Sequence, residues 1–202
     1  MPRLLPSLSA SFVRGAAALA LAGLLAGCAT YQPPAEPPFY RSLVAPGSEV
    51  DAAAAASMVS GFRANNGLGP VTMDPELNRL AKQHSQVQAA KMKTGHDIGD
   101  GTLEQRAKAA GYKYTRIAEN VAGGYHTLAE AFSGWRDSSG HRKNMLMPQA
   151  TRIGVAVAQA PGSKYKVFWT MILAEPGEPK VVVLTTGAPL PSSVPDTVIN
   201  VH

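Results

Sequence analysis

Cysteine is almost absent from this chain. Cys28 is the only one among 202 residues, so disulfide bonds within the chain are excluded and the fold must rely on a packed core. With 45% hydrophobic and 16% charged residues, the chain can bury one sizeable core. We therefore expect a single domain with a tail at each end.

Long uniform runs of residues are also lacking. The net charge is +5, but lysine and arginine are spread in ones and twos and are not interleaved with aromatic residues. We therefore expect no binding of nucleic acid. The apolar run Ala16 to Ala26 has 11 residues, whereas a membrane-spanning helix needs about 20. Such a run suits a signal peptide better than a transmembrane helix.

Several enzyme signatures are missing as well. The sequence contains no HExxH zinc motif, no GxSxG nucleophile elbow and no glycine-rich phosphate loop. Any chemistry must therefore come from residues that are far apart in the chain and meet only after folding.

The N-terminus has the pattern of an export signal. Arg3 and Arg14 precede the apolar run, which ends in Leu-Ala-Gly-Cys28. This ending resembles the lipobox of bacterial lipoproteins, whose cysteine is acylated, as with palmitate, and becomes the mature N-terminus. We expect residues 1–27 to be a signal peptide and Cys28 to be lipidated. Cleavage would remove two arginines and lower the net charge from +5 to +3.

Proline marks the other boundaries of the predicted domain. Five prolines between positions 33 and 46 favour an extended spacer, so we assign residues 28–50 to a lipidated tether of up to roughly 60 Å. The globular domain is expected at 51–176. Prolines recur in 177–202, which we expect to be a C-terminal tail. An edge strand at 181–186 is the alternative.

The first two thirds of the predicted domain reads as helical. A helical run covers 52–62, and Asp74 caps a second helix that continues to about Lys93. Capping boxes begin further helices at Thr102 and Thr127. On these helices, His84 lies on an apolar stripe, so we interpret it as a hydrogen-bonded packing residue, and we assign Trp135 to the core.

The last part of the domain reads as strands. Residues 152–159 and 165–174 are rich in valine, isoleucine and aromatic residues, and the segment between them predicts a hairpin. A short strand is expected at 117–122. Helices first and strands last predict an α+β fold with helices packed on a small antiparallel sheet.

Two histidines and one glutamate are the candidate site residues. His96 follows Gly95, Glu119 precedes the turn at Gly123, and His141 follows Gly140; we expect all three on loops. Two imidazole nitrogens, one carboxylate oxygen and a water would form an open site for zinc or another divalent metal. The alternative is a polar network in which Glu119 orients an imidazole and holds the loops together. The sequence does not decide between them.

A family resemblance rests on motifs that occur in order through the predicted domain. They are NNGLGPVTMDPELNRL (65–80), AKQHS (81–85), GH (95–96), AAGY (109–112), EN (119–120), WxxSxxHRxNML (135–146), IGVA (153–156) and FWT (168–170). Together they resemble the bacterial branch of the CAP superfamily, which includes cysteine-rich secretory proteins, venom antigens and plant pathogenesis-related proteins.

The resemblance implies a three-layer α-β-α sandwich with a central cleft lined by two histidines and acidic residues. His96, Glu119 and His141 match cleft positions. Ser138 stands where many eukaryotic members have a second acid, so a site with two histidines and two glutamates is not expected. The neighbouring Asp137 would point about 100° away on a helix.

These observations lead to one expected function and two alternatives. We expect an exported, lipid-anchored envelope protein that contacts the membrane through Cys28 and binds a lipid or envelope component in its cleft. Because Ala29 is not an evident inner-membrane retention signal, we expect the periplasmic side of the outer membrane in a Gram-negative cell. The alternatives are a metal-assisted hydrolase of peptide or cell-wall bonds, with His96, Glu119 and His141 as catalytic candidates, and a structural envelope component.

Overall fold

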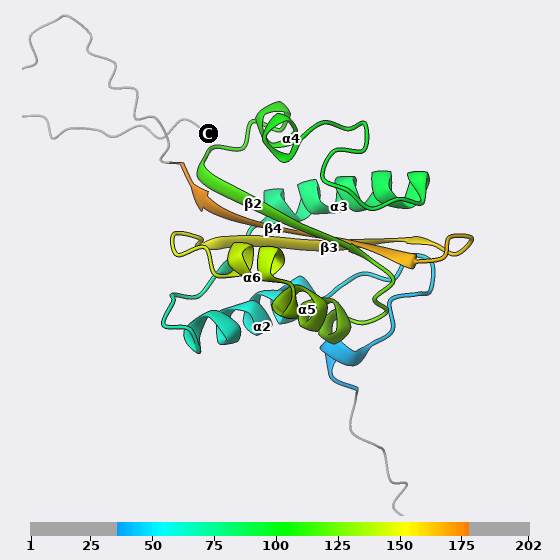
Figure 1. Ribbon diagram of the computed structural model, residues 1–202, viewed down its shortest axis with the longest axis horizontal. Helices are drawn as coiled ribbons and strands as arrows, with labels where there is room; N and C mark the ends of the chain where they lie inside the picture. Colours follow the sequence, from blue (N-terminus) through cyan, green and yellow to red (C-terminus); the bar gives the residue numbers. More distant parts are fainter. Residues whose placement is uncertain (1–35, 178–202) are drawn as a thin grey trace, which may run out of the picture. The chain divides into compact units, whose positions relative to one another are not determined.

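The computed structural model describes residues 36–177 (Figure 1). In chain order the helices are η1 (Pro38–Tyr40, a 3-10 turn), α2 (Ala52–Ala64), α3 (Pro75–Lys91), α4 (Leu103–Ala109), α5 (Leu128–Asp137) and α6 (Ser139–Met145). The strands are β1 (Thr72–Met73), β2 (Tyr114–Gly123), β3 (Arg152–Ala160) and β4 (Lys166–Pro176). The predicted signal peptide, Cys28 and the segment 181–186 lie outside the described residues.

The elements form the three-layer sandwich expected. The sheet has the strand order β1-β3-β4-β2, with α3 and α4 on one face and α2, α5 and α6 on the other (Figure 1). The expectation of a purely antiparallel sheet is wrong at one edge, because β1 pairs in parallel with β3. β1 is only two residues long, too short to produce a readable alternation of side chains.

Local capping explains where the helices start. The side chain of Asp74 accepts hydrogen bonds from the first backbone N–H groups of α3. Thr102 and Thr127 form complete capping boxes with Gln105 and Glu130. The predicted starts of these three helices are confirmed, because a cap depends on residues that are neighbours in sequence.

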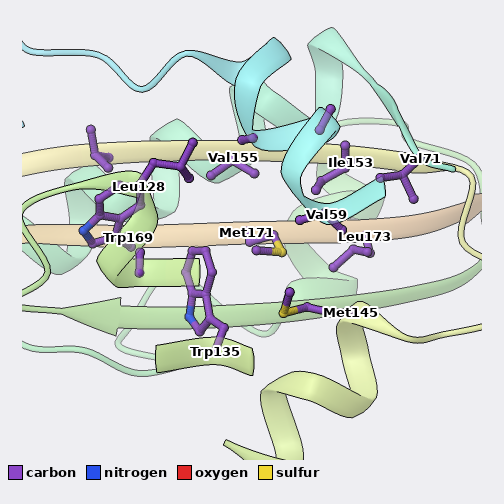
Figure 2. Packing of buried hydrophobic residues seen from close by; sticks show 14 of the residues in the cluster. Val59, Val71, Leu128, Trp135, Met145, Ile153, Val155, Trp169, Met171 and Leu173 are labelled. Carbon is purple, nitrogen blue, oxygen red and sulfur yellow. The ribbon is translucent and has the colours of Figure 1, made fainter. Parts of the chain in front are cut away.

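The largest hydrophobic cluster lies between the sheet and the layer of α2, α5 and α6 (Figure 2). Trp135 of α5 packs edge to face on Trp169 of β4, with 6.0 Å between ring centroids and an interplanar angle of 87°. Both indoles are fully buried, which confirms Trp135 as a core residue. Such aromatic pairs stabilise a core by about 0.5–1.5 kcal/mol beyond the buried area.

Part of the edge of β3 beyond β1 is covered by a side chain. The backbone N–H of Val155 donates to Asn78 Oδ1 at 3.0 Å, and Asn78 belongs to α3. Among residues 36–177, helix α3 therefore closes a part of this edge that β1 leaves open.

The domain begins earlier than expected. Leu43 is 3% exposed within the core, and its N–H donates to the carbonyl of His126 at 2.8 Å. The amide of Gln159 donates to the carbonyls of Leu43 and Ser48 at 3.0 and 2.9 Å. The prediction of an extended spacer is therefore wrong for residues 38–50, because single apolar residues such as Leu43 dock on the domain despite the neighbouring prolines.

A buried arginine holds the segment before β3 in place. Arg63 of α2 is fully buried and burial lowers the pKa of its guanidinium. The guanidinium donates hydrogen bonds to five backbone carbonyls, those of Gly69, Met145, Met147, Pro148 and Ala150, at 2.8 to 3.5 Å. One side chain thus satisfies backbone carbonyls in the segment after α2 and in the segment from the end of α6 to β3.

We expect Arg63→Leu to lower the free energy of unfolding by about 3–5 kcal/mol, because it leaves several buried carbonyls without donors. Urea denaturation monitored by circular dichroism would measure the change. The control is Arg116→Leu, which removes an exposed ion pair with Glu175 and should cost less than about 1 kcal/mol. Equal effects of the two substitutions would contradict the role assigned to Arg63.

Candidate functional site

The three predicted site residues come from three kinds of element. His96 lies on the loop after α3, Glu119 lies in the middle of β2, and His141 lies in α6. The expectation that all three occupy loops is thus wrong for Glu119 and His141. Strand β2 is longer than the predicted 117–122, and α6 begins directly after the break at Ser138.

Glu119 is the centre of the site. Its side chain is 2% exposed, and such a carboxylate is costly to bury unless charged and hydrogen-bonding partners compensate it. Oε2 lies 3.0 Å from Nδ1 of His96, and Oε1 forms an ion pair with the guanidinium of Arg106. Both carboxylate oxygens therefore have a partner.

Arg106 of α4 also fastens the loop that carries His96. Its Nη1 donates to the carbonyls of His96 and Gly101, each at 2.9 Å. The Arg106 side chain is only 8% exposed. Sequence reasoning missed this residue, because a single arginine on a short helix has no pattern that separates it from a solvated charge.

His84 also contacts the loop that carries His96. Its Nδ1 lies 2.6 Å from Oδ2 of Asp100, and its Nε2 lies 2.8 Å from the carbonyl of Gly95. The ring is fully buried, which confirms the interpretation of His84 as a hydrogen-bonded packing residue. Its Nε2 is also 3.8 Å from Oε2 of Glu119, so the packing histidine forms the floor of the site.

Two asparagines join α6 to the edge of β2. The amide of Asn144 donates to the carbonyl of Glu119 at 3.0 Å and to Oδ1 of Asn120 at 2.9 Å. Asn120 in turn donates to the carbonyl of His141 at 3.0 Å. These bonds place His141 beside the strand, but in residues 36–177 its ring forms no hydrogen bond with His96 or Glu119.

The two imidazoles have opposite electrostatic environments. The hydrogen bond that Glu119 accepts raises the pKa of His96, partly offset by burial and by Arg106. Partial burial lowers the pKa of His141, and the charge on His96 lowers it further. The arrangement therefore favours protonation of His96 over protonation of His141.

Neighbouring residues do not complete a second acidic position. Asp137 pairs with Arg136 and its side chain is 66% exposed, in agreement with its expected direction away from the site. Ser138 ends α5 in an extended conformation. In the described part of the chain, Glu119 is therefore the one carboxylate that contacts His96.

The arrangement does not fit a metal ion. Among residues 36–177, no group of three or more His, Cys, Asp or Glu side chains is placed to hold one. A cation at Glu119 would also meet the positive charge of Arg106. The predicted zinc site stays a prediction, and the polar network is the alternative that the geometry favours.

Two surface hollows lie elsewhere on the domain. One, of about 300 Å³, lies between α3, β3 and Glu49, and the other, of about 390 Å³, lies between α4 and the start of β2. Neither is lined by His96, Glu119 or His141. The site therefore lies outside both hollows. The side chain of His96 is 61% exposed.

Comparisons with known proteins match most of the domain. Residues 56–173 match the model of the cysteine-rich secretory protein family, CAP. The chain is 34% identical over 99 residues to the uncharacterized protein YkwD of Bacillus subtilis, a match that covers 48% of this chain and 38% of YkwD.

Solved structures show the same fold. An extracellular SCP-domain protein from Bacillus anthracis is 26% identical, with a TM-score of 0.54 over 61% of this chain and 39% of that protein. An outer surface protein from Borrelia burgdorferi is 16% identical, with a TM-score of 0.54 over 60% of this chain and 90% of that protein. The chain therefore spans less than two fifths of the two Bacillus proteins.

We expect the pKa of His96 to exceed the usual value of about 6.5 and to fall in Glu119→Gln, measured by NMR titration of the ring protons. Because the folded-state pKa is raised, the stabilisation from this pair is full below about pH 6.5 and is lost as pH rises through the raised value. Glu104→Gln, on the exposed side of α4, is the control and should leave the pKa unchanged. An unaltered pKa in Glu119→Gln would disprove the contact.

Proposed function

From the premise that the chain belongs to the cysteine-rich secretory protein (CAP) family, we propose that it is an exported, lipid-anchored protein of the bacterial cell envelope. It binds a ligand, a lipid or another envelope component, through the imidazoles of His96 and His141. The binding site is held in shape by Glu119 and Arg106.

The proposal rests on one observation, that both carboxylate oxygens of Glu119 have a partner. A carboxylate with both oxygens engaged by Arg106 and His96 is not free to accept a proton from water, as a general base of hydrolysis must. The contact with Glu119 raises the pKa of the exposed His96 ring and so favours its charged, hydrogen-bond-donating form. Such a donor suits an anionic head group, because charge-assisted hydrogen bonds are stronger than neutral ones.

Export is supported by the sequence and by the relatives. The Bacillus anthracis relative is described as extracellular and the Borrelia burgdorferi one as an outer surface protein. Within residues 36–177, no helix combines the length and apolarity that crossing a membrane requires. Lipidation of Cys28 would supply attachment in its place, on the periplasmic side of the outer membrane in a Gram-negative cell.

A hydrolase is the second candidate function. The opposite pKa shifts of His96 and His141 are the kind that separates an acid from a base at a catalytic site. In the metal-assisted form of this alternative, zinc bound by His96, Glu119 and His141 would activate water, and Arg106 would first have to leave Glu119. A purely structural role in the envelope is the third alternative and predicts no ligand.

For binding without turnover, we expect no product from peptides or muropeptides, with or without zinc, and no heat in a zinc titration. Calorimetry with monomeric short-chain phosphatidylglycerol and with muropeptides should show binding by one of them. His96→Ala should weaken that binding about tenfold, the effect of one charge-assisted hydrogen bond.

The control for this experiment is His126→Ala, an exposed histidine outside the site, which should bind like the wild type. Zinc-dependent cleavage that His141→Ala abolishes would replace the binding proposal by the hydrolase. The absence of any binding to these ligands would favour the structural role.

For the anchor, we expect Cys28→Ser to move the full-length protein in bacterial cells from the detergent phase to the aqueous phase. The same substitution should abolish incorporation of labelled palmitate, because it removes the one cysteine of this chain. Ala29→Ser, which keeps the cysteine, is the control and should partition like the wild type. Unchanged partitioning of Cys28→Ser would refute lipidation.

A further inference from the structure

We propose that one end of the domain rests on an anionic phospholipid bilayer, an inference that adds to the proposed anchoring at Cys28. This end consists of the last residues of α3 and the hairpin between β3 and β4. We call it the lysine end and define it by Met92, Lys93, Lys164 and Lys166. None of these four residues is among the site residues assigned above.

The four residues come together from two distant parts of the chain. Helix α3 ends at Lys91, and the hairpin runs from Ala160 to Lys166. The two parts lie close together, because a Cβ atom added at Gly162 would lie 4.0 Å from Cε of Met92. The lysine end is therefore a single surface.

Within residues 36–177, the charges of the lysine end have no acidic partner. Lys93, Lys164 and Lys166 are exposed, and within the described residues none of them has a carboxylate within salt-bridge distance. Lys164 instead lies over the ring of Tyr165, 4.7 Å from its centroid. The nearest acid along the chain, Asp97, accepts a hydrogen bond from the backbone of Gly99. Three free ammonium groups give this surface a positive charge.

Backbone strain is concentrated at the same place. In residues 36–177, the non-glycine residues with positive φ are Met92 (φ 50°) and Lys166 (φ 62°). Met92 ends α3 in the left-handed conformation that favours glycine, yet the residue is 55% exposed. An exposed thioether gains little from packing in water, so the strained methionine points to an apolar partner outside the domain.

Residues 43–48 of the N-terminal segment lie close to this hairpin. Gln159, at the start of the hairpin, holds the carbonyls of Leu43 and Ser48. The described residues begin at Glu36, and the eight residues from Cys28 to that point can span at most about 28 Å in any conformation. A lipid on Cys28 would therefore keep Glu36 close to the bilayer.

Ammonium groups around an exposed apolar side chain match the chemistry of an anionic bilayer. Lysines attract the phosphates of the surface, and Met92 can enter the boundary between head groups and acyl chains. Each lysine should contribute about fivefold to binding. A soluble polyanion would use the lysines equally well, but it offers nothing to Met92.

The experiment is vesicle flotation with the chain from Ala29 onward, which keeps the whole compact unit that begins at Glu36 and carries no lipid. We expect it to float with vesicles of equal parts phosphatidylglycerol and phosphatidylcholine, and not with phosphatidylcholine alone. Replacing Lys93, Lys164 and Lys166 with glutamine should weaken binding about 100-fold. The matched control replaces Lys108, Lys113 and Lys143, exposed lysines outside this end, and should bind like the wild type.

Met92→Gly separates a bilayer from a polyanion. Glycine relieves the left-handed backbone, so the melting temperature should stay or rise, while vesicle binding should fall at least about fivefold with the loss of the apolar side chain. Unchanged vesicle binding of Met92→Gly, or an equal loss in the control triple variant, would overturn the proposal. Because the assay does not involve Cys28, its failure would leave lipidation untouched, and the failure of lipidation would leave this result standing.

Discussion

The site depends on the neutralisation of one buried carboxylate. Glu119 lies within a strand and has almost no contact with water, so its charge needs partners that other elements supply. Arg106 reaches it from α4, His96 from the loop after α3, and His84 closes the floor. The short helix α4 is also held by Leu103 and Ala107, which are buried in a hydrophobic cluster with α3 and the sheet. The contacts that compensate the charge of Glu119 therefore also hold the loop after α3 in place.

This constraint also limits what the site can do. Because Arg106 and His96 occupy the carboxylate, the polar groups left facing solvent are imidazoles, one charged more readily than usual and one less readily. A surface of that kind recognises a partner through hydrogen bonds and charge. Hydrolysis would require the ion pair at Glu119 to open first, which costs free energy that substrate binding would have to supply.

The sequence predicted those features that depend on near neighbours. The caps at Asp74, Thr102 and Thr127, the hairpin between β3 and β4, and the buried role of Trp135 follow from local patterns and are confirmed. The family motifs also predicted the three layers. The roles of Arg63 and Arg106 could not be predicted, because each contacts residues brought close only by folding, and an arginine in a helix is otherwise read as a surface charge. The two-residue strand β1 has no pattern of its own.

In residues 36–177, the edge of β3 that β1 leaves open is closed at Val155 by an asparagine of α3. Open strand edges are templates on which a second molecule can add its own strand. The side-chain amide of Asn78 takes the place of a partner strand there. It leaves no continuous row of backbone donors and acceptors with which the strand of a second molecule could pair. Copies of this domain held at high density on one surface would therefore not pair through this part of the β3 edge.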